Sequence, residues 1–384
     1  MPAFYPTLFL VLSIVSLSLF VVKIAGAYAI TLAAFFTLIF IIKTFNKIKI
    51  SSISVFLSFI CFLMFKAAIN VLWIDVMHFF RSFLLTSVFI YCYISSFTIK
   101  STFIFKVDYR SFLIYSTVLI VGFELLQILE QFLLGSTDLW FLLDGLSIST
   151  ADNIDRFEAV NFLGFSRPIS FYHEPSYLGT VLLVLFAVND IQVKSKLVYF
   201  TLLFSILLTL SSTAVLFLFM YVLTNFINQH QRSSVLIILF AILALIVMQV
   251  DLVSILRIDE IFVIGTSGWY RVMFPMEATI KVLEGSPFGI PLAQAEFIYD
   301  NSLFLIISYF GVLTPFLALG WIVFIKHKLK TMIFTIKYFV VFFCTLFLSG
   351  AIFTFESTVL CILLNFAFIN GVDNETAINY NNNV

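Results

Sequence analysis

The chain has 384 residues, of which 62% are hydrophobic, only 11% are charged and 50 are Phe. Its mean hydropathy is +1.11, and apolar runs recur from end to end, which excludes a soluble globular protein and indicates a polytopic membrane protein. The 21 basic and 21 acidic residues cancel, and no dense Lys/Arg cluster occurs, so we expect no nucleic-acid partner.

The sequence lacks the short motifs of several common catalytic and metal sites. It has no P-loop, no G-x-S-x-G and no H-E-x-x-H, so nucleotide, serine-hydrolase and zinc-protease chemistry are not indicated. The four cysteines have no C-x-x-C or Cys/His spacing and all lie in apolar runs: Cys61, Cys92, Cys344 and Cys361. We therefore expect no metal and no cofactor.

Apolar runs long enough to cross a membrane recur along the whole chain. A span needs about 17 to 25 predominantly apolar residues, and this rule predicts an all-α polytopic membrane protein with about 12 transmembrane helices. We expect one integral membrane domain, residues 1–384, with a retained first span rather than a removed signal peptide. The predicted helices cover residues 6–22, 24–42, 50–65, 77–97, 113–134, 176–188, 197–210, 213–228, 234–250, 302–325, 332–348 and 352–369.

Basic residues indicate the orientation, because short cytoplasmic loops carry an excess of Lys and Arg. Such residues follow every even-numbered predicted span, among them Lys43, Lys100, Lys194, Arg232 and Lys326. Both termini, including the polar tail at about 370–384, are therefore predicted to be cytoplasmic. Two long loops, residues 135–175 and 251–301, then lie on the outer side, and loops of this length are usually functional or disordered. Their aromatic content favours folded loops.

The first outer loop ends in FSRPISFYHEPSYL, residues 165–178, which concentrates Arg167, His173 and Glu174 between two prolines. Pro168 and Pro175 fix their own φ and push the residues before them toward extended conformations, so this segment is not a continuous helix. Non-helical backbone beside apolar spans persists only where it is buried in protein or lines a wet cavity. The segment is therefore predicted to form the mouth of a site, with Glu174 as the candidate base.

The second outer loop carries a further cation and a carboxylate. Arg271 follows Trp269 and Tyr270, and Asp300 and Asn301 stand directly before the next predicted span. In span four, Arg81 lies about one turn from the predicted outer end, where an ionisable group by default faces the bundle interior or a wet cavity. Three converging Arg side chains, from positions 81, 167 and 271, would suit a pyrophosphate, whose oxygens accept paired N–H bonds.

Each of these residues also has a purely structural interpretation. Arg81 would snorkel to the interface or pair with Asp75 or Glu124, and Arg167 would close its loop by pairing with Glu174. Glu174 would favour the helix start electrostatically, and Asp300 with Asn301 would form a helix N-cap. The three remaining candidates would be ordinary surface or interfacial residues: His173, Tyr270 and Arg271.

The passage RPISFYHEPSYLGTVLL, an outer-loop Arg followed by an E-P-S that opens a span, resembles the O-antigen polymerase (Wzy-type) family of bacterial surface-polysaccharide polymerases. The passage SGWYRVMFPMEATIKVLEGSPFGI is similar to that family's Arg, then a helix, then P-x-x-G. YDNSLFLIISYFGVLTP resembles the family's entry to the next span. With the hydropathy plan, the resemblance extends over most of the chain.

The resemblance implies a membrane glycosyltransferase C-like bundle and a concrete reaction. A polysaccharide on undecaprenyl pyrophosphate would be transferred to a fresh lipid-linked repeat unit at the outer face of the bacterial inner membrane. Arg167 and Arg271 would neutralise the pyrophosphate, and Glu174 would orient or deprotonate the acceptor hydroxyl. Undecaprenyl-pyrophosphate-linked glycans and membrane lipid are the expected partners, and a polysaccharide chain-length regulator is a further candidate.

Two alternative functions stay open from the sequence. An O-antigen ligase would resemble the polymerase, but the related lipid A-core ligases have a His at the entry to the span that here begins near Asp300, and this chain has none. A lipid-glycan flippase or transporter would use intramembrane charges. Glu124 and Glu130 in span five are acids that a proton path would use, although no other clear acid within the membrane is available to relay to.

Overall fold

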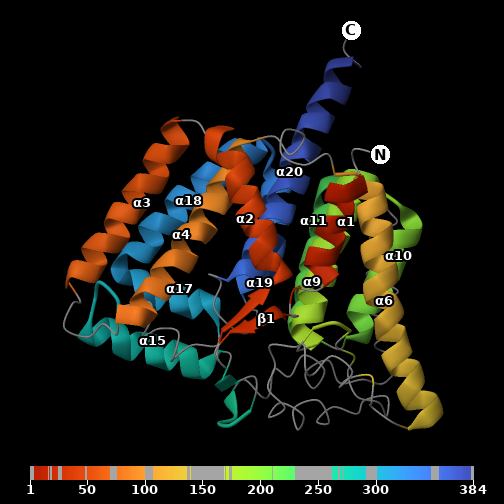
Figure 1. Ribbon diagram of the computed structural model, residues 1–384, viewed down its shortest axis with the longest axis horizontal. Coiled ribbons are helices and arrows are strands. Elements are labelled where there is room, and N and C mark those ends of the chain that lie inside the picture. Colours follow the sequence, from red (N-terminus) through yellow and green to blue (C-terminus); the bar gives the residue numbers. More distant parts are fainter. Residues whose placement is uncertain are drawn as a thin grey trace. The chain divides into compact units, whose positions relative to one another are not determined.

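The computed structural model describes residues 4–15, 17, 20–24, 28–47, 50–69, 76–99, 107–135, 139, 168, 170–172, 175–209, 211–229, 262–266, 269–270, 272–290, 301–346 and 354–381. The chain divides into two compact units. The first unit comprises residues 1–48, 95–215 and 355–384, and the second comprises residues 49–94 and 216–354. Figure 1 shows both units as built from helices, with one small strand pair.

The first unit contains most of the N-terminal, central and C-terminal helices. Its members are α1 (Phe4–Val15), β1 (Phe20–Ile24), β2 (Tyr28–Thr31), α2 (Leu32–Thr44), the 3-10 turn η1 (Phe45–Lys47), α6 (Tyr109–Leu134), α9 (Pro175–Val188), the π-helical turn η5 (Asn189–Val193), α10 (Lys196–Leu208) and α20 (Phe355–Asn381). Every residue of α9 is buried, and α9 packs against α6, α10 and α20. This buried helix is the centre of the unit.

The second unit contains α3 (Ile50–Ile69), most of α4 (Val76–Thr98) and of α11 (Ser212–Gln229), α15 (Met273–Gly285), α17 (Ser302–Phe310), the 3-10 turn η7 (Gly311–Leu313), α18 (Thr314–Leu329) and α19 (Met332–Leu346). Three of its helices meet at a polar contact between aromatic side chains. Trp321 of α18 donates its Nε1–H to the Tyr93 hydroxyl at 2.7 Å, and that hydroxyl lies 2.7 Å from the Tyr338 hydroxyl of α19. These bonds satisfy buried polar groups that would otherwise be costly.

The predicted boundary between the first two spans is wrong. Helix α1 ends at Val15 rather than at residue 22, and a β-hairpin occupies the region where the end of the first span and the start of the second were expected. Strand β1 pairs antiparallel with β2, from Phe20 opposite Thr31 to Ile24 opposite Tyr28. The strand sequences FVVKI and YAIT are rich in β-branched and aromatic residues, which favour strands over helices. An apolar run alone does not distinguish the two structures.

The helical architecture is otherwise confirmed, while the number of spans is not. In the part of the chain that the structure describes, four helical stretches are long and apolar enough to cross a membrane: Tyr109–Leu134, Pro175–Val193, Ser302–Leu329 and Phe355–Val372. Six shorter apolar helices accompany them within the described ranges. The predicted span at 234–250 lies outside the described residues. Helix α20 continues to Asn381, so most of the predicted tail is helical.

Candidate active site

The structure describes only part of the predicted site. Tyr270 and Asn301 are described with their side chains, and Arg81 lies in α4 with its side chain undescribed. The other predicted site residues lie outside the described residues: Arg167, His173, Glu174, Arg271 and Asp300. Described residues that flank them show how each of the two long loops is held.

Ser170 fixes the first loop to α6. Its backbone N–H donates to Gln127 Oε1 at 2.9 Å, its carbonyl accepts from Gln127 Nε2 at 3.4 Å, and its hydroxyl donates to the Ile120 carbonyl at 2.8 Å. Ser170 is only 3% exposed and has a φ of 52°, a left-handed conformation that a non-glycine residue adopts at a cost of about 1 to 3 kcal/mol. The three bonds hold this conformation midway between Arg167 and His173.

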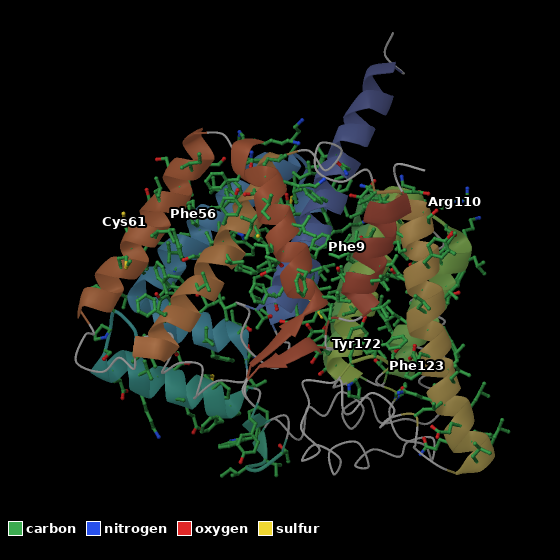
Figure 2. All side chains as sticks on the ribbon, in the orientation of Figure 1. Phe9, Phe56, Cys61, Arg110, Phe123 and Tyr172 are labelled. Carbon is green, nitrogen blue, oxygen red and sulfur yellow. The ribbon has the colours of Figure 1, made fainter. Side chains whose placement is uncertain are left out.

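The two aromatic residues after Ser170 complete the anchor. Phe171 stacks on Phe123 of α6 with 4.5 Å between ring centroids, and Tyr172 stacks on Tyr177 of α9 at 5.7 Å. The Tyr172 hydroxyl donates to the Ile14 carbonyl of α1 at 2.9 Å, and burial raises the pKa of this hydroxyl well above its usual value, so it stays a neutral donor. Figure 2 labels Phe123 and Tyr172 in this unit.

The segment Pro168–Pro175 is thus held on both sides. Pro175 is the first residue of α9, where a missing N–H is tolerated and the fixed φ suits the first helical turn. Contacts to α1, α6 and α9 fix the chain before and after His173 and Glu174. The prediction of a non-helical segment before this span is confirmed for the described residues, and its rigidity stays a prediction.

Helix α6 carries a row of buried polar side chains, which the sequence analysis did not recognise as an anchor. Glu124, Gln127 and Glu130 recur at intervals of three residues and therefore share one helix face. Both carboxylate oxygens of Glu130 accept from the Leu139 N–H at 3.1 Å, and Glu124 Oε2 accepts from the Ser205 hydroxyl of α10. Among the described residues, the second oxygen of Glu124 has no hydrogen-bond partner. The polar spacing within an apolar span was the available signal.

We expect Gln127→Leu to release the loop without unfolding the chain. The substitution leaves the N–H and C=O of Ser170 buried and unpaired, at about 1 to 3 kcal/mol per group. Chymotrypsin cleavage after Phe171 or Tyr172, followed by mass spectrometry, should accelerate about tenfold or more, because proteolysis follows the population of the open form. Leu126→Ala, at an exposed position next to Gln127 on α6, is the control and should cleave like wild type. Equal rates for both variants would contradict the anchoring role.

The second long loop, which is predicted to lie on the outer side, contains a helix on the C-terminal side of Arg271. Tyr270 is 49% exposed and packs edge-on against Trp269 and Phe274, with centroids 5.0 and 5.9 Å away. Helix α15 begins two residues after Arg271, and its Thr279 hydroxyl lies 3.1 Å from the Ser308 hydroxyl of α17. The helix that the resemblance places after Arg271 is thus present, and it is followed by Pro287-Phe288-Gly289, which is one residue shorter than P-x-x-G. Tyr270 keeps about half of its surface available for a ligand.

The loop after α15 is inserted into a break in the next span. Ile290 N–H donates to the Ser308 carbonyl at 2.9 Å, and Val312 N–H donates to the Pro287 carbonyl at 2.9 Å. Gly289 and Gly311 meet at this junction with φ values of 81° and 58°. The span Ser302–Leu329 is interrupted here by the 3-10 turn η7. The position of α15 is therefore fixed by backbone hydrogen bonds.

Asn301 caps α17. Its Oδ1 accepts from the Leu303 N–H at 2.9 Å, and its side chain is buried. The helix N-cap interpretation of this residue is therefore confirmed. A role for Asn301 in substrate binding, and the base role considered for Asp300, stay predictions.

Among the described residues, no group of three or more His, Cys, Asp or Glu side chains is arranged to hold a metal ion. Within its own unit, each long loop is held to a helix: Ser170 is hydrogen-bonded to α6, and the loop after α15 is hydrogen-bonded to α17 and η7.

Comparison with known proteins identifies the family. The family model described as WcaD colanic acid polymerase matches residues 6–369, nearly the whole chain. No curated protein and no solved structure matches the chain.

Proposed function

The chain belongs to the WcaD colanic acid polymerase family, and on that premise we propose a site and a mechanism for the polymerisation of repeat units into exopolysaccharide. The protein is a multi-pass membrane glycosyltransferase of the polymerase type. The match over residues 6–369 is the observation that carries this function.

The donor that we propose is a glycan on undecaprenyl pyrophosphate, and the acceptor is a fresh lipid-linked repeat unit. A lipid-linked substrate suits an enzyme whose catalytic segments are attached directly to apolar spans. The reaction would take place at the outer face of the inner membrane, with both termini cytoplasmic, within a glycosyltransferase C-like bundle. A chain-length regulator would act on the same membrane face.

Arg167 and Arg271 would hold the pyrophosphate. The acceptor hydroxyl oxygen would form a bond to the anomeric carbon of the donor, and the bond from that carbon to the pyrophosphate oxygen would break. The guanidinium groups would neutralise the charge that develops on the leaving undecaprenyl pyrophosphate. Stabilisation of developing charge by fixed groups is usually the largest single contribution to catalysis. Arg81 would bind the same group from span four.

Glu174 would take the proton of the acceptor hydroxyl, with His173 beside it and Asp300 as the second carboxylate of the site. Preorganisation supports this assignment, because a base acts only if it is held within hydrogen-bond reach of the proton it removes. The flanking Ser170 and Tyr172 are both buried and hydrogen-bonded to membrane helices. Tyr270 would stack on a sugar face, which aromatic rings suit, and Asn301 would contact the substrate at the entry to α17.

We test this proposal in a deletion strain complemented with wild type, Arg167→Ala, Arg271→Ala or Glu174→Ala. Each variant should insert in the membrane at wild-type level but leave single repeat units in place of a polymer ladder, with a loss of about 100-fold or more in polymerisation. Arg156→Ala, in the same outer loop, is the matched control and should retain the ladder.

Three other outcomes would overturn parts of the proposal. Ladders that persist in all three variants would remove these residues from the site. Repeat units trapped on the cytoplasmic side in the deletion strain would indicate a flippase. Polymer of normal length that is no longer attached to its final acceptor would indicate a ligase.

A further inference from the structure

One face of helix α15 packs against the membrane span that follows it. Pro275 and Thr279 are buried, one turn apart, and Thr279 is hydrogen-bonded to Ser308 of α17. Figure 1 shows α15 lying crosswise at one end of α3 and α4, which belong to the same unit. The helix therefore lies across the ends of membrane helices and not among them.

The rest of α15 is divided between an apolar and a charged face. At about 100° per residue, Glu277, Lys281 and Glu284 fall opposite Pro275 and Thr279, and these three are exposed. Between the docked face and the charged face lie Met276 and Ile280, which are 37% and 50% exposed although both are apolar. Half-buried Leu283 continues this row one turn further.

The apolar row of α15 continues onto a membrane span. Phe288, in the loop after α15, is 65% exposed. Its neighbour Pro287 accepts a hydrogen bond from Val312 at the break in the span Ser302–Leu329. Val312 and Phe316 are themselves exposed on that span, where an apolar surface faces lipid. Exposed apolar side chains thus occur on α15, on the short Pro287–Gly289 loop and on the adjoining part of the span, which this loop joins through a hydrogen bond.

We propose that α15 is an interfacial helix that binds the lipid surface. Met276 and Ile280 enter the boundary between head groups and acyl chains, while Glu277, Lys281 and Glu284 stay in water. An amphipathic helix parallel to the membrane takes this position because it buries apolar area without removing charges from water. The lipid contact sets the depth in the membrane interface of the chain next to Arg271, which lies two residues before α15. A link between that depth and the pyrophosphate of a lipid-linked glycan rests on the proposed function; the lipid contact itself does not.

The experiment places single cysteines at four positions of α15 in a full-length chain whose native cysteines are replaced by Ala. Met276→Cys and Ile280→Cys report on the apolar row, and Glu277→Cys and Glu284→Cys are the matched controls on the charged face. Each is labelled with bimane and reconstituted in nanodiscs that hold one copy. We expect the labels at 276 and 280 to be quenched strongly by lipids with a nitroxide high on the acyl chain and only weakly by aqueous iodide. The control labels at 277 and 284 should be quenched strongly by iodide and weakly by the nitroxide.

A second measurement needs no variant. In wild-type protein, lipids with a diazirine near the head group should leave photo-adducts on Met276 or Ile280 and on α18, as mapped by mass spectrometry. Two results would overturn the proposal: iodide quenching of equal strength at all four positions, or labels at 276 and 280 shielded from both quenchers, which would mean that protein covers the row. Adducts on α18 without any on α15 would also overturn it. Because neither readout involves polymerisation, failure here is distinguishable from failure of the proposed function.

Discussion

Replacing Gly311 by Ala is expected to destabilise the second unit by several kcal/mol. Gly311 has φ 58° and ψ −137°, a combination essentially confined to glycine, which costs another residue about 1 to 3 kcal/mol. A Cβ there would also overlap the Pro287 carbonyl oxygen and lie 2.6 Å from the Gly289 nitrogen. These are backbone atoms, which cannot rotate aside, so overpacking adds about 1 to 3 kcal/mol.

Gly289→Ala should destabilise the same junction, because its Cβ would overlap backbone atoms on the other side of it. Its φ is 81°, and a Cβ would overlap the carbonyl oxygens of Ser308 and Tyr309. Either substitution separates the loop after α15 from the break in the span and so breaks the hydrogen bonds that fix α15. We therefore expect both variants to lose polymer as well as stability.

The measurement is unfolding of the purified full-length chain in detergent micelles, together with the amount of folded protein recovered from membranes. Gly320→Ala and Gly285→Ala are the matched controls, because a Cβ at either position would meet no atom within 4 Å. The helical Gly320→Ala should be neutral or stabilising by up to about 1 kcal/mol. If the junction variants were as stable as these controls, the two glycines would not be needed for docking.

The sequence was most informative where the signal was local. The Pro-bounded loop before α9 and the Asn301 cap follow from residues a few positions apart, and the helix after Arg271 is what the family resemblance implies. The described residues confirm all three. Glu124 and Glu130 stand out as acids in an apolar span, and the sequence indicates for them a proton path and, for Glu124, a pair with Arg81. The anchoring role of this helix face depends on the contact between Gln127 and Ser170, which are 43 residues apart. Sequence patterns do not predict such a contact.

The features that the sequence did not reveal depend on contacts between distant residues. Tyr172 bonds to Ile14 across 158 positions, and no periodicity predicts such a pair. The Pro287–Gly289 loop fits a break in the next span because two glycines let two backbones approach, whereas hydropathy predicts a continuous helix there. At the N-terminus, an apolar run of β-branched residues satisfies a helix window and a strand equally well. The hydropathy of the sequence thus indicates a membrane protein, whereas polar contacts between distant residues determine how the loops are held.

Glu124→Lys is expected to be nearly as damaging as the junction variants. Glu124 is fully buried between α6 and α10, where the Ser205 hydroxyl is its described partner. A lysine there would place a longer, cationic side chain against a hydroxyl that is poorly suited to neutralise it. An uncompensated buried charge costs about 3 to 5 kcal/mol, and the packing of α6 against α10, and with it the Ser170 anchor, should weaken.

Glu124→Gln is the matched control, because it keeps the length of the side chain and an oxygen that accepts the Ser205 hydroxyl. Its loss should stay within the net worth of one hydrogen bond, about 0.5 to 1.5 kcal/mol. Unfolding in micelles measures the loss of stability, and chymotrypsin cleavage after Tyr172 measures the loss of the Ser170 anchor. A Gln variant as damaged as the Lys variant would mean that the carboxylate itself is required at this position. A stable Lys variant would mean that the α6 and α10 interface contains water or an acceptor that can take a cation, and the buried row would then be open to ions or protons.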